Sequence, residues 1–306
     1  MSESLIIPSM GWLPDYPDIR DITSQSDVAS TRLKSLGQPS VKQMLGKVGH
    51  SGSKASTATL PNSVDLRPWC SPIENQETIG SCTAHAGVGL VEYFERRAFG
   101  KHIDSSRLFL YKVTRNLLHW SGDTGAFLRS TMQALTLFGT PPEEYYPYLI
   151  ADFDKEPSAF CYSFAQNYQA ISYYRLDPPG SMPATLLTHI KTALAAGLPS
   201  MFGFTVYNSI SQAKASGGKI PFPTPGERVA GGHAVDAVGY DDNLKIKNSN
   251  RGATETTGAL LIRNSWGSKW GSEGYGWLPY QYVLSGLATD WWSLLKNEWV
   301  DSGQFG

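Results

Sequence analysis

The sequence predicts an α+β protein with two lobes, and two observations support this class. Helical patterns dominate from Leu60 to about residue 165, whereas short β-branched and aromatic runs between glycine and proline clusters follow from about residue 166. A helix-rich half followed by a strand-rich half is typical of α+β proteins. The 306 residues, 41% of them apolar, suffice for one large domain or two modest ones. We expect a helix-rich lobe over 60–167 and a strand-rich lobe over 168–306.

Residues 1–59 precede both lobes and contain little that could form a core. Residues 11–19 are expected to be extended, because prolines fix their own φ and push the preceding residue out of the helical region. The stretch 47–59, rich in Ser, Gly, Lys and Ala, is typical of a flexible linker. The first eight residues lack both a basic start and an apolar core, so no secretory signal is recognisable.

Three helices are expected in the first half, over 82–98, 107–118 and 128–138. Apolar residues recur along them at helical spacing, and Gly139 with two prolines soon after ends the third. In the second half, alternating β-branched and aromatic residues predict antiparallel strands. These strands are expected at 200–207, 233–240, 259–263 and 291–294. Because clefts between lobes are common sites of binding and catalysis, the junction of the two halves is the expected functional site.

Charge and cysteine content exclude several classes of function. The 26 basic and 27 acidic residues leave no electrostatic footprint for nucleic acid or an anionic membrane, and no apolar run approaches the roughly 20 residues of a membrane span. Three scattered cysteines are too few for a disulfide framework and form no close pair that could bind zinc. We therefore expect neither metal nor cofactor. The compartment stays open between the cytoplasm and export by a non-standard route.

Cys82 is the candidate nucleophile of the chain. It follows Gly80 and Ser81, where a turn leads into the first predicted helix. A helix N-terminus lowers the pKa of a thiol, and the thiolate is the nucleophilic form. The alternative is a buried core cysteine, a common fate of the residue. Cys70 and Cys161 have no comparable setting and are expected to be inert.

His233 is the candidate base, because it lies between a Gly-Gly turn and a predicted strand. A strand is a rigid support for a base, and glycines allow close approach of a substrate. His85, one helical turn after Cys82, is the competing candidate. We expect His85 to be a core histidine of the helical lobe instead.

Two amides complete the candidate site. The side-chain carbonyl of Asn264 can accept a hydrogen bond from the far ring nitrogen of His233, and so fix its tautomer and orientation. Trp266 could shield that bond from water. Gln76, six residues before Cys82, could form an oxyanion hole with the backbone N–H of Cys82. Without these partners, each would be an ordinary loop residue.

These residues give the chain its resemblance to a known family. It resembles the papain-like cysteine peptidases, in particular their bacterial xylellain-like branch, over nearly the whole chain from residue 60 onward. The landmarks occur in the family's order, and although each is weak alone the set is highly specific. They are Val64-Asp65-Leu66-Arg67, Asn75-Gln76, Gly80-Ser81-Cys82, Tyr146-Pro147-Tyr148, His233-Ala234-Val235, Val238-Gly239-Tyr240 and the segment from Asn264-Ser265-Trp266-Gly267 to Trp270-Gly271.

The resemblance implies a fold, an activity and roles for residues. The fold would be a helical left lobe and an antiparallel β-barrel-like right lobe with the active site between them. Cys82 would be the nucleophile, His233 the base, Asn264 its orienting residue and Gln76 the oxyanion donor, with Trp266 and Trp270 in support. A peptide substrate would bind along residues that the family's pattern places in the cleft, namely Gly125, Ala126, Phe127, Gly203, Ala230 and Gly232.

The resemblance also implies a zymogen, in which residues 1–59 hold an inhibitory segment that occupies the cleft of a monomeric peptidase. The alternatives for these residues are a disordered extension, or a strap packed on the back of one lobe for stability. The sequence departs from the family in three ways. Thr83 replaces the tryptophan that usually follows the nucleophile, Ile79 replaces a bridging cysteine, and the usual helical pro-domain pattern is missing. These differences leave the candidate catalytic residues in place, but they bear on secretion, substrate preference and the mode of inhibition.

Two other functions fit parts of the pattern. A transglutaminase-like acyl transferase also uses Cys and His, but it normally orients its base with Asp, so Asn264 argues against it. A non-catalytic binding protein on the same fold would not need Cys82, Gln76, His233 and Asn264 together. Labelling by a peptidyl epoxide, which requires a nucleophilic thiol in a peptide cleft, would separate these readings.

Overall fold

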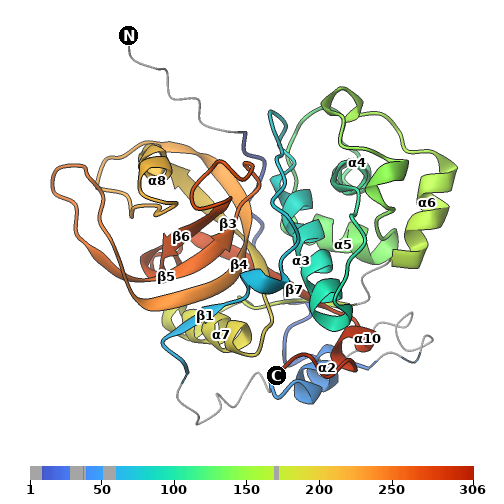
Figure 1. Cartoon of the computed structure of the whole chain (residues 1–306), viewed down its shortest axis with the longest axis horizontal. Coiled ribbons are helices and arrows are strands. Elements are labelled where there is room, and N and C mark those ends of the chain that lie inside the picture. The colour runs from blue at the N-terminus through green and yellow to red at the C-terminus, as the bar shows by residue number, and fades with distance from the viewer. Residues whose placement is uncertain (1–8, 28–36, 38, 51–59, 169–171) are drawn as a thin grey trace.

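The structure, a computed structural model, describes residues 9–27, 37, 39–50, 60–168 and 172–306. Figure 1 shows a strand-rich lobe on the left and a helical lobe on the right, with the N-terminal segment passing between them. None of the helices within these ranges is long and apolar enough to cross a membrane. The predicted α+β class with two lobes is confirmed.

The helical lobe contains four α-helices, whose ends lie within one residue of prediction for the first three. They are α3 (Cys82–Phe99), α4 (Arg107–Leu117), α5 (Leu128–Leu137) and α6 (Ala159–Ala165), with the short 3-10 turns η1 (Arg67–Trp69), η2 (Glu143–Tyr145), η3 (Ile150–Asp152) and η4 (Gln166–Tyr168). Local chemistry fixes the ends. Ser106 caps α4 by accepting from the Phe109 N–H, and Gly100, at φ 73°, ends α3 in the left-handed conformation.

The strand lobe is built on one antiparallel sheet with the order β2-β7-β3-β4-β5-β6. Among the described residues β2 and β6 lie at its two edges, so the sheet is not closed into a barrel. The strands are β1 (Ser63–Asp65), β2 (Ser172–Arg175), β3 (Ser200–Tyr207), β4 (Val229–Ile246), β5 (Thr256–Arg263), β6 (Tyr275–Pro279) and β7 (Ala288–Leu295). Each predicted strand is present. β3 has the predicted bounds, and β4, β5 and β7 extend beyond theirs because flanking residues also pair.

Further helices follow β2 in the sequence. They are α7 (Pro183–Ala195), η5 (Asn208–Ser211), α8 (Gln212–Ala215), α9 (Tyr280–Leu284) and α10 (Asn297–Val300). Figure 1 shows α7 below the sheet and α8 above it. Pro183 begins α7, where its missing N–H leaves no hydrogen bond unmade.

The two lobes exchange their chain ends. β1, from the helix-rich half of the sequence, pairs with β4 through Val64 and Tyr240. In return α10, near the C-terminus, packs on α3, where the rings of Trp299 and Phe94 stack with centroids 5.3 Å apart. The boundary expected near residue 168 is therefore crossed in both directions.

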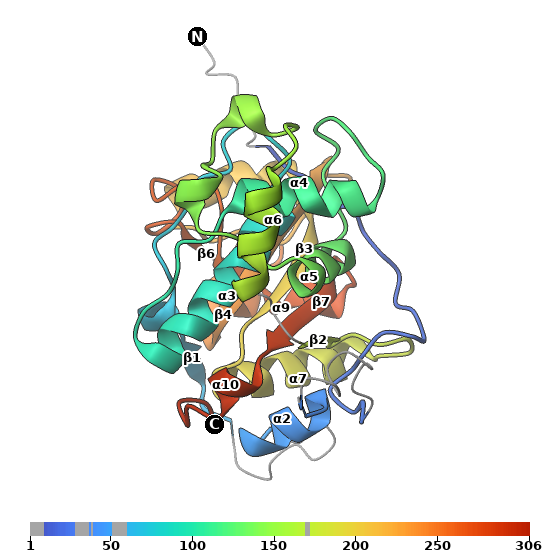
Figure 2. The same ribbon diagram turned by 90° about the vertical axis from the view of Figure 1, so that its right-hand side faces the viewer.

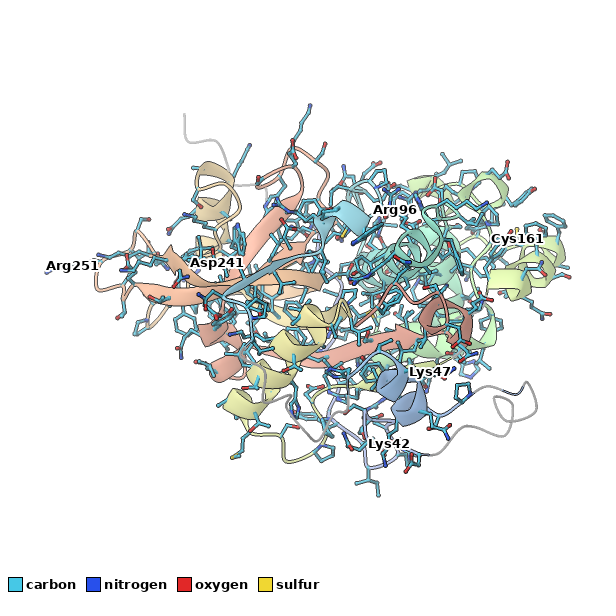
Figure 3. All side chains as sticks on the ribbon, turned by 60° about the horizontal axis from the view of Figure 1, so that its bottom comes forward. Lys42, Lys47, Arg96, Cys161, Asp241 and Arg251 are labelled. Atoms are coloured by element: carbon cyan, nitrogen blue, oxygen red, sulfur yellow. The ribbon has the colours of Figure 1, made fainter. Side chains whose placement is uncertain are left out.

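The N-terminal segment contains a packed helix, α2 (Val41–Lys47), that the sequence reading missed. Ser40 and Gln43 form a capping box at its start. Met44 and Leu45 are fully buried. Figure 2 shows α2 beside α10 and the C-terminus, and Lys47, labelled in Figure 3, pairs with Asp301 across that junction at 2.7 Å.

The expected linker over 47–59 is only partly described. Lys47 ends α2, and Val48, 2% exposed, packs in the core, so this first part is ordered structure rather than linker. Residues 51–59 lie outside the described residues.

Candidate active site

Cys82 is the first residue of α3 and is fully buried. The turn before it is held by Asp123, whose Oδ1 accepts from the Gly80 N–H at 2.8 Å and from the Tyr111 hydroxyl at 2.6 Å. Gly80 itself is closely packed, since a Cβ there would lie 3.2 Å from the same Oδ1. The sulfur therefore sits at a helix N-terminus whose approach is fixed by side chains from the rest of the lobe.

His233 lies on β4, across the lobe junction from α3, and its ring has two distinct nitrogens. Nε2 is 2.8 Å from Asn264 Oδ1, and since an amide oxygen only accepts, Nε2 carries the proton. Nδ1 has no hydrogen-bond partner among the residues that the structure describes, so its lone pair is free of them. The Trp266 ring stacks on the imidazole with centroids 4.4 Å apart, and Trp270 meets Trp266 edge-on at 5.4 Å. The His–Asn bond is thereby covered by aromatic rings.

Gln76 is oriented by Ser265, a residue that sequence reasoning did not single out. Ser265 Oγ donates to Gln76 Oε1 at 2.6 Å, and the Gln76 N–H donates to the Ser265 carbonyl at 2.8 Å. Gln76 Nε2 donates to Ile79 O and Ser9 O, each at 3.0 Å. Because carbonyl oxygens only accept, these two bonds identify the nitrogen end of the amide.

Residues 9–13, hereafter the cleft segment, lie across the candidate site and bond to both lobes. The Ala126 N–H donates to Gly11 O at 2.8 Å, the Leu13 N–H donates to Ala126 O at 3.1 Å, and the Trp12 N–H donates to Gly232 O at 3.2 Å. Trp12 and Ala126 form a parallel bridge. The main chain of the cleft segment thus contacts Ala126, Gly232 and also Gly125, where a Cβ would lie 2.2 Å from Gly11 O; all three are residues expected to bind a peptide.

Trp12 is the anchor of the cleft segment and is 6% exposed. Its indole lies against Gly203, where a Cβ would approach a ring carbon to 1.9 Å, and against Gly232, where the corresponding distance is 2.9 Å. At the inner end its Nε1 donates to Asp290 Oδ2 at 3.1 Å. The pocket that holds it, hereafter the Trp12 pocket, has glycine walls and a carboxylate at its end.

Burial keeps the candidate dyad neutral while the cleft segment is bound. It raises the pKa of the Cys82 thiol to about 11, despite the opposing hydrogen bonds from backbone N–H groups, that of Gly11 among them. Burial also lowers the pKa of His233 to about 4, against the opposing hydrogen bond to Asn264. Both shifts favour the neutral thiol and the neutral imidazole over a thiolate–imidazolium pair in this state.

The remaining candidates lie where their surroundings explain them. His85 is buried in the helical lobe, its Nδ1 3.1 Å from the Ser81 carbonyl oxygen, and burial lowers its pKa to about 3, as expected of a core histidine. The Phe127 ring faces Trp120, with centroids 5.5 Å apart. Ala230 precedes Gly231, where a Cβ would lie 2.8 Å from the Met10 sulfur.

All three cysteines are free, in agreement with the expected lack of a disulfide. Cys161 lies on α6 at the far edge of the helical lobe, as Figure 3 shows. Cys70 donates weakly to the Leu66 carbonyl, and burial raises the pKa of its thiol to about 11. Cys161 is the third residue of α6, with Ser158 Oγ 3.3 Å from its sulfur, but neither cysteine has a hydrogen bond to a histidine among the described residues.

Comparison with known proteins agrees with this architecture. The model of the papain family of cysteine proteases matches residues 60–293. The crystal structure of xylellain, a cysteine protease from Xylella fastidiosa, is similar, with a TM-score of 0.70 and 31% identity, over 94% of this chain and 96% of that one.

Two further relatives broaden the comparison. An uncharacterized peptidase C1-like protein of Acanthamoeba polyphaga mimivirus is 30% identical over 95% of this chain and 88% of its own length. Digestive procathepsin L 3 of Tenebrio molitor shares the fold, with a TM-score of 0.58 and 21% identity, over 79% of this chain and 72% of that one. The chain belongs to the papain family of cysteine proteases. It is thus a thiol protease, and its resemblance to the xylellain-like branch is also confirmed.

Proposed function

We propose that Cys82, His233, Asn264 and Gln76 carry out peptide hydrolysis in this protease. The observation that supports this assignment most directly is the carbonyl oxygen of Ser9, which accepts a hydrogen bond from Gln76 Nε2 at 3.0 Å beside the start of α3. A peptide carbonyl already lies where a scissile carbonyl would need an oxyanion donor.

The reaction then follows from the residue types. His233 Nδ1 takes the proton of the Cys82 thiol, and the sulfur attacks the scissile carbonyl carbon. The oxyanion accepts from Gln76 Nε2 and from the Cys82 N–H. The imidazolium of His233 gives its proton to the leaving amine, and the C–N bond breaks. The acyl group remains on the sulfur as a thioester. His233 next deprotonates a water that attacks the thioester, and the sulfur leaves and takes a proton back.

Four alanine variants test the assignment. Cys82→Ala should abolish hydrolysis of a peptide substrate, and Cys70→Ala, which also removes a buried thiol, is the matched control and should keep it. His233→Ala should lose more activity than Asn264→Ala, because orienting a base contributes less than being the base. Retained turnover in Cys82→Ala would refute the mechanism.

We further propose that the cleft segment inhibits the enzyme until it is displaced. It occupies the backbone partners Ala126 and Gly232, so a substrate cannot pair with them at the same time. The Gly11 N–H also lies close enough to the Cys82 sulfur to act on the pKa of its thiol, so the cleft segment covers the candidate nucleophile. The proform structures among the family's solved members are consistent with such a segment.

Ionic contacts extend this inhibitory contact beyond the cleft segment. Arg129 on α5 pairs with Asp15 at 2.6 Å and with Asp21 at 2.8 Å, so the chain just after the cleft segment is held on the helical lobe. The test is a peptide covering residues 9–21, added in trans to the full chain carrying Trp12→Ala. The peptide should restore inhibition, and the same peptide with Trp12→Ala should restore less.

A further inference from the structure

A small cavity lies at the junction of the two lobes, next to Asn264. The space open to the centre of a water molecule is about 10 Å³. A cavity of this size holds about one water. Its polar lining comes from one helix and two strands, and includes His85 of α3, Asp236 of β4 and Arg263 of β5.

These three residues are neighbours in sequence of the residues proposed to carry the reaction. His85 comes three residues after Cys82 in the same helix. Asp236 comes three residues after His233 in the same strand. Arg263 immediately precedes Asn264. A ligand in the cavity would therefore contact each element that carries a member of the candidate triad.

Each of the three side chains has a buried polar atom without a hydrogen-bond partner among the described residues. The atoms are Nε2 of His85, Oδ1 of Asp236 and Nε of Arg263. The three residues are 3%, 2% and 6% exposed. Buried polar atoms in native proteins are nearly always bonded to protein or to ordered water, so three such atoms around one cavity indicate a polar ligand.

The donors and acceptors around the cavity match a single water. His85 Nδ1 lies 3.1 Å from the Ser81 carbonyl oxygen, which only accepts, so Nδ1 carries the proton. Burial lowers the pKa of His85 to about 3, so the ring is neutral and Nε2 accepts. Asp236 Oδ1 also accepts, and Arg263 Nε donates. A water donates two hydrogen bonds and accepts up to two, which satisfies all three atoms.

The protonation state of Asp236 does not alter this match. Burial raises the pKa of Asp236 well above its usual range, against the opposing charge of Arg263. A neutral carboxyl group still has a carbonyl oxygen that accepts, and its hydroxyl donates. Since a water both donates and accepts, it can bond to either form of the acid.

The surrounding contacts hold these side chains in place. Arg263 Nη2 donates to Ser71 Oγ at 2.9 Å and to the Pro72 carbonyl at 2.7 Å. On α3, a Cβ at Gly89 would lie 2.4 Å from Arg263 Nη1 and 2.7 Å from Asp236 Oδ2. Both side chains thus lie against the helix backbone, and glycine is needed for this close approach.

We propose that the cavity binds one water, which links His85 on α3 to Asp236 on β4 and Arg263 on β5. His85 and Asp236 are thereby positioning residues, because the water ties the helix that carries Cys82 to the strand that carries His233. Figure 1 shows α3 beside β4 at the lobe junction. The inference rests on the proposed function, since the residues that it positions are those of the same site.

A high-resolution crystal structure of the full-length protein tests the water directly. One water should lie within about 3.2 Å of His85 Nε2 and of Asp236 Oδ1. In His85→Phe, whose larger ring has no acceptor and extends into the cavity, that water should be lost. Well-ordered His85 and Asp236 side chains with no water between them would overturn the proposal.

Kinetics test the positioning role, in the full chain carrying Trp12→Ala. His85→Phe and Asp236→Leu each remove one partner of the water. Their kcat for a peptide substrate should fall about 10- to 100-fold, because misplacing reacting groups by about 1 Å has effects of this size. Their KM should change less than about twofold, since the expected backbone partners of the substrate, Ala126 and Gly232, do not line the cavity.

Three further variants sharpen the test. Asp236→Asn keeps an oxygen that accepts from the water, so its kcat should stay within about threefold of the parent. His50→Phe makes the same change at another buried histidine and should leave kcat unchanged. The double variant His85→Phe/Asp236→Leu should lose no more than the slower single variant, because both changes remove the same water.

The outcomes separate this inference from the proposed function. Unchanged kcat in both His85→Phe and Asp236→Leu would overturn the positioning role, as would losses that multiply in the double variant. If Asp236→Leu does not fold, His85→Phe and the crystal structure decide. Retained turnover in Cys82→Ala would instead refute the proposed function, and the positioning role with it, whereas the water site is tested by the electron density alone.

Discussion

Gly11→Ala should release the cleft segment by steric overlap alone. A Cβ on Gly11 would lie 1.9 Å from the Gly80 carbonyl oxygen and 2.4 Å from its carbon. Real Cβ atoms keep at least 3.0 Å, so residue 11 must retreat by about 1 Å. Gly80 cannot yield in its place, because its N–H is bound to Asp123 at 2.8 Å and it precedes the turn into α3.

The free-energy cost of this shift of residue 11 can be estimated from the contacts that it disturbs. Overpacking costs about 1–3 kcal/mol. A shift of this size also breaks the 2.8 Å bond from the Ala126 N–H to Gly11 O, worth roughly 1 kcal/mol. The cleft segment should therefore lose about 2–4 kcal/mol of binding, which raises the population of open enzyme roughly 30- to 1000-fold.

The assay compares initial rates of peptide hydrolysis by the full-length wild type and the variant at equal folded concentration. Gly46→Ala is the matched control, because the same change in α2 meets nothing within 4 Å. Gly11→Ala should be the faster enzyme by at least about tenfold, whereas Gly46→Ala should match the wild type. Equal rates for all three, with a normal melting temperature, would show that the cleft segment does not limit access to Cys82.

Three further outcomes are expected. First, iodoacetamide at pH 8 should label Cys82 slowly in the wild type and quickly in Gly11→Ala, since burial under the cleft segment raises the pKa of this thiol to about 11. Mass spectrometry of the labelled peptide measures both rates. Equal rates would contradict the effect of burial. Second, Leu45→Ala, fully buried in α2, should lower the free energy of unfolding by about 2–5 kcal/mol, measured by urea denaturation; a change below 0.5 kcal/mol would mean that α2 is not part of the core. Third, burial raises the pKa of Asp290 to about 7, above the roughly 3.9 of an unfolded chain, so ionising it weakens the fold as pH rises from about 4 to about 7. The melting temperature of Asp290→Asn, relative to that of the wild type, should therefore rise over this pH window. A constant difference between the two melting temperatures would refute the pKa shift.

Periodicity and turn chemistry sufficed for the parts of the fold whose signals are local. The helix from Cys82 ends at Phe99, where Gly100 stops it, and β3 has the predicted bounds. His233 and Asn264, 31 residues apart, are within 2.8 Å of each other, as their residue types and the family pattern implied. These features depend on short-range preference or on a pattern shared with relatives.

What the sequence could not reveal depends on long-range contacts. Asp290 follows Thr289 and precedes two tryptophans, so in a strand pattern it is only a polar interruption. Its role depends on Trp12, 278 residues away, and on Arg175. The one available signal was a single charged residue in a predicted strand, since such a group is seldom buried without a partner. Similarly, α2 is short, and its apolar face is explained only by the C-terminal residues it packs against.

The exchange of chain ends between the lobes has a consequence for the order of events during synthesis. Val64 in β1 must wait for Tyr240 in β4, and Phe94 must wait for Trp299, so neither lobe is complete until almost the whole chain has left the ribosome. Cys82 is translated early, but His233 and Asn264 arrive late, and only then can a nucleophile and its base meet. By that time more than two hundred residues have been added to the chain after residues 9–13. The proposed inhibitory segment is thus made before the residues of the proposed catalytic centre can come together.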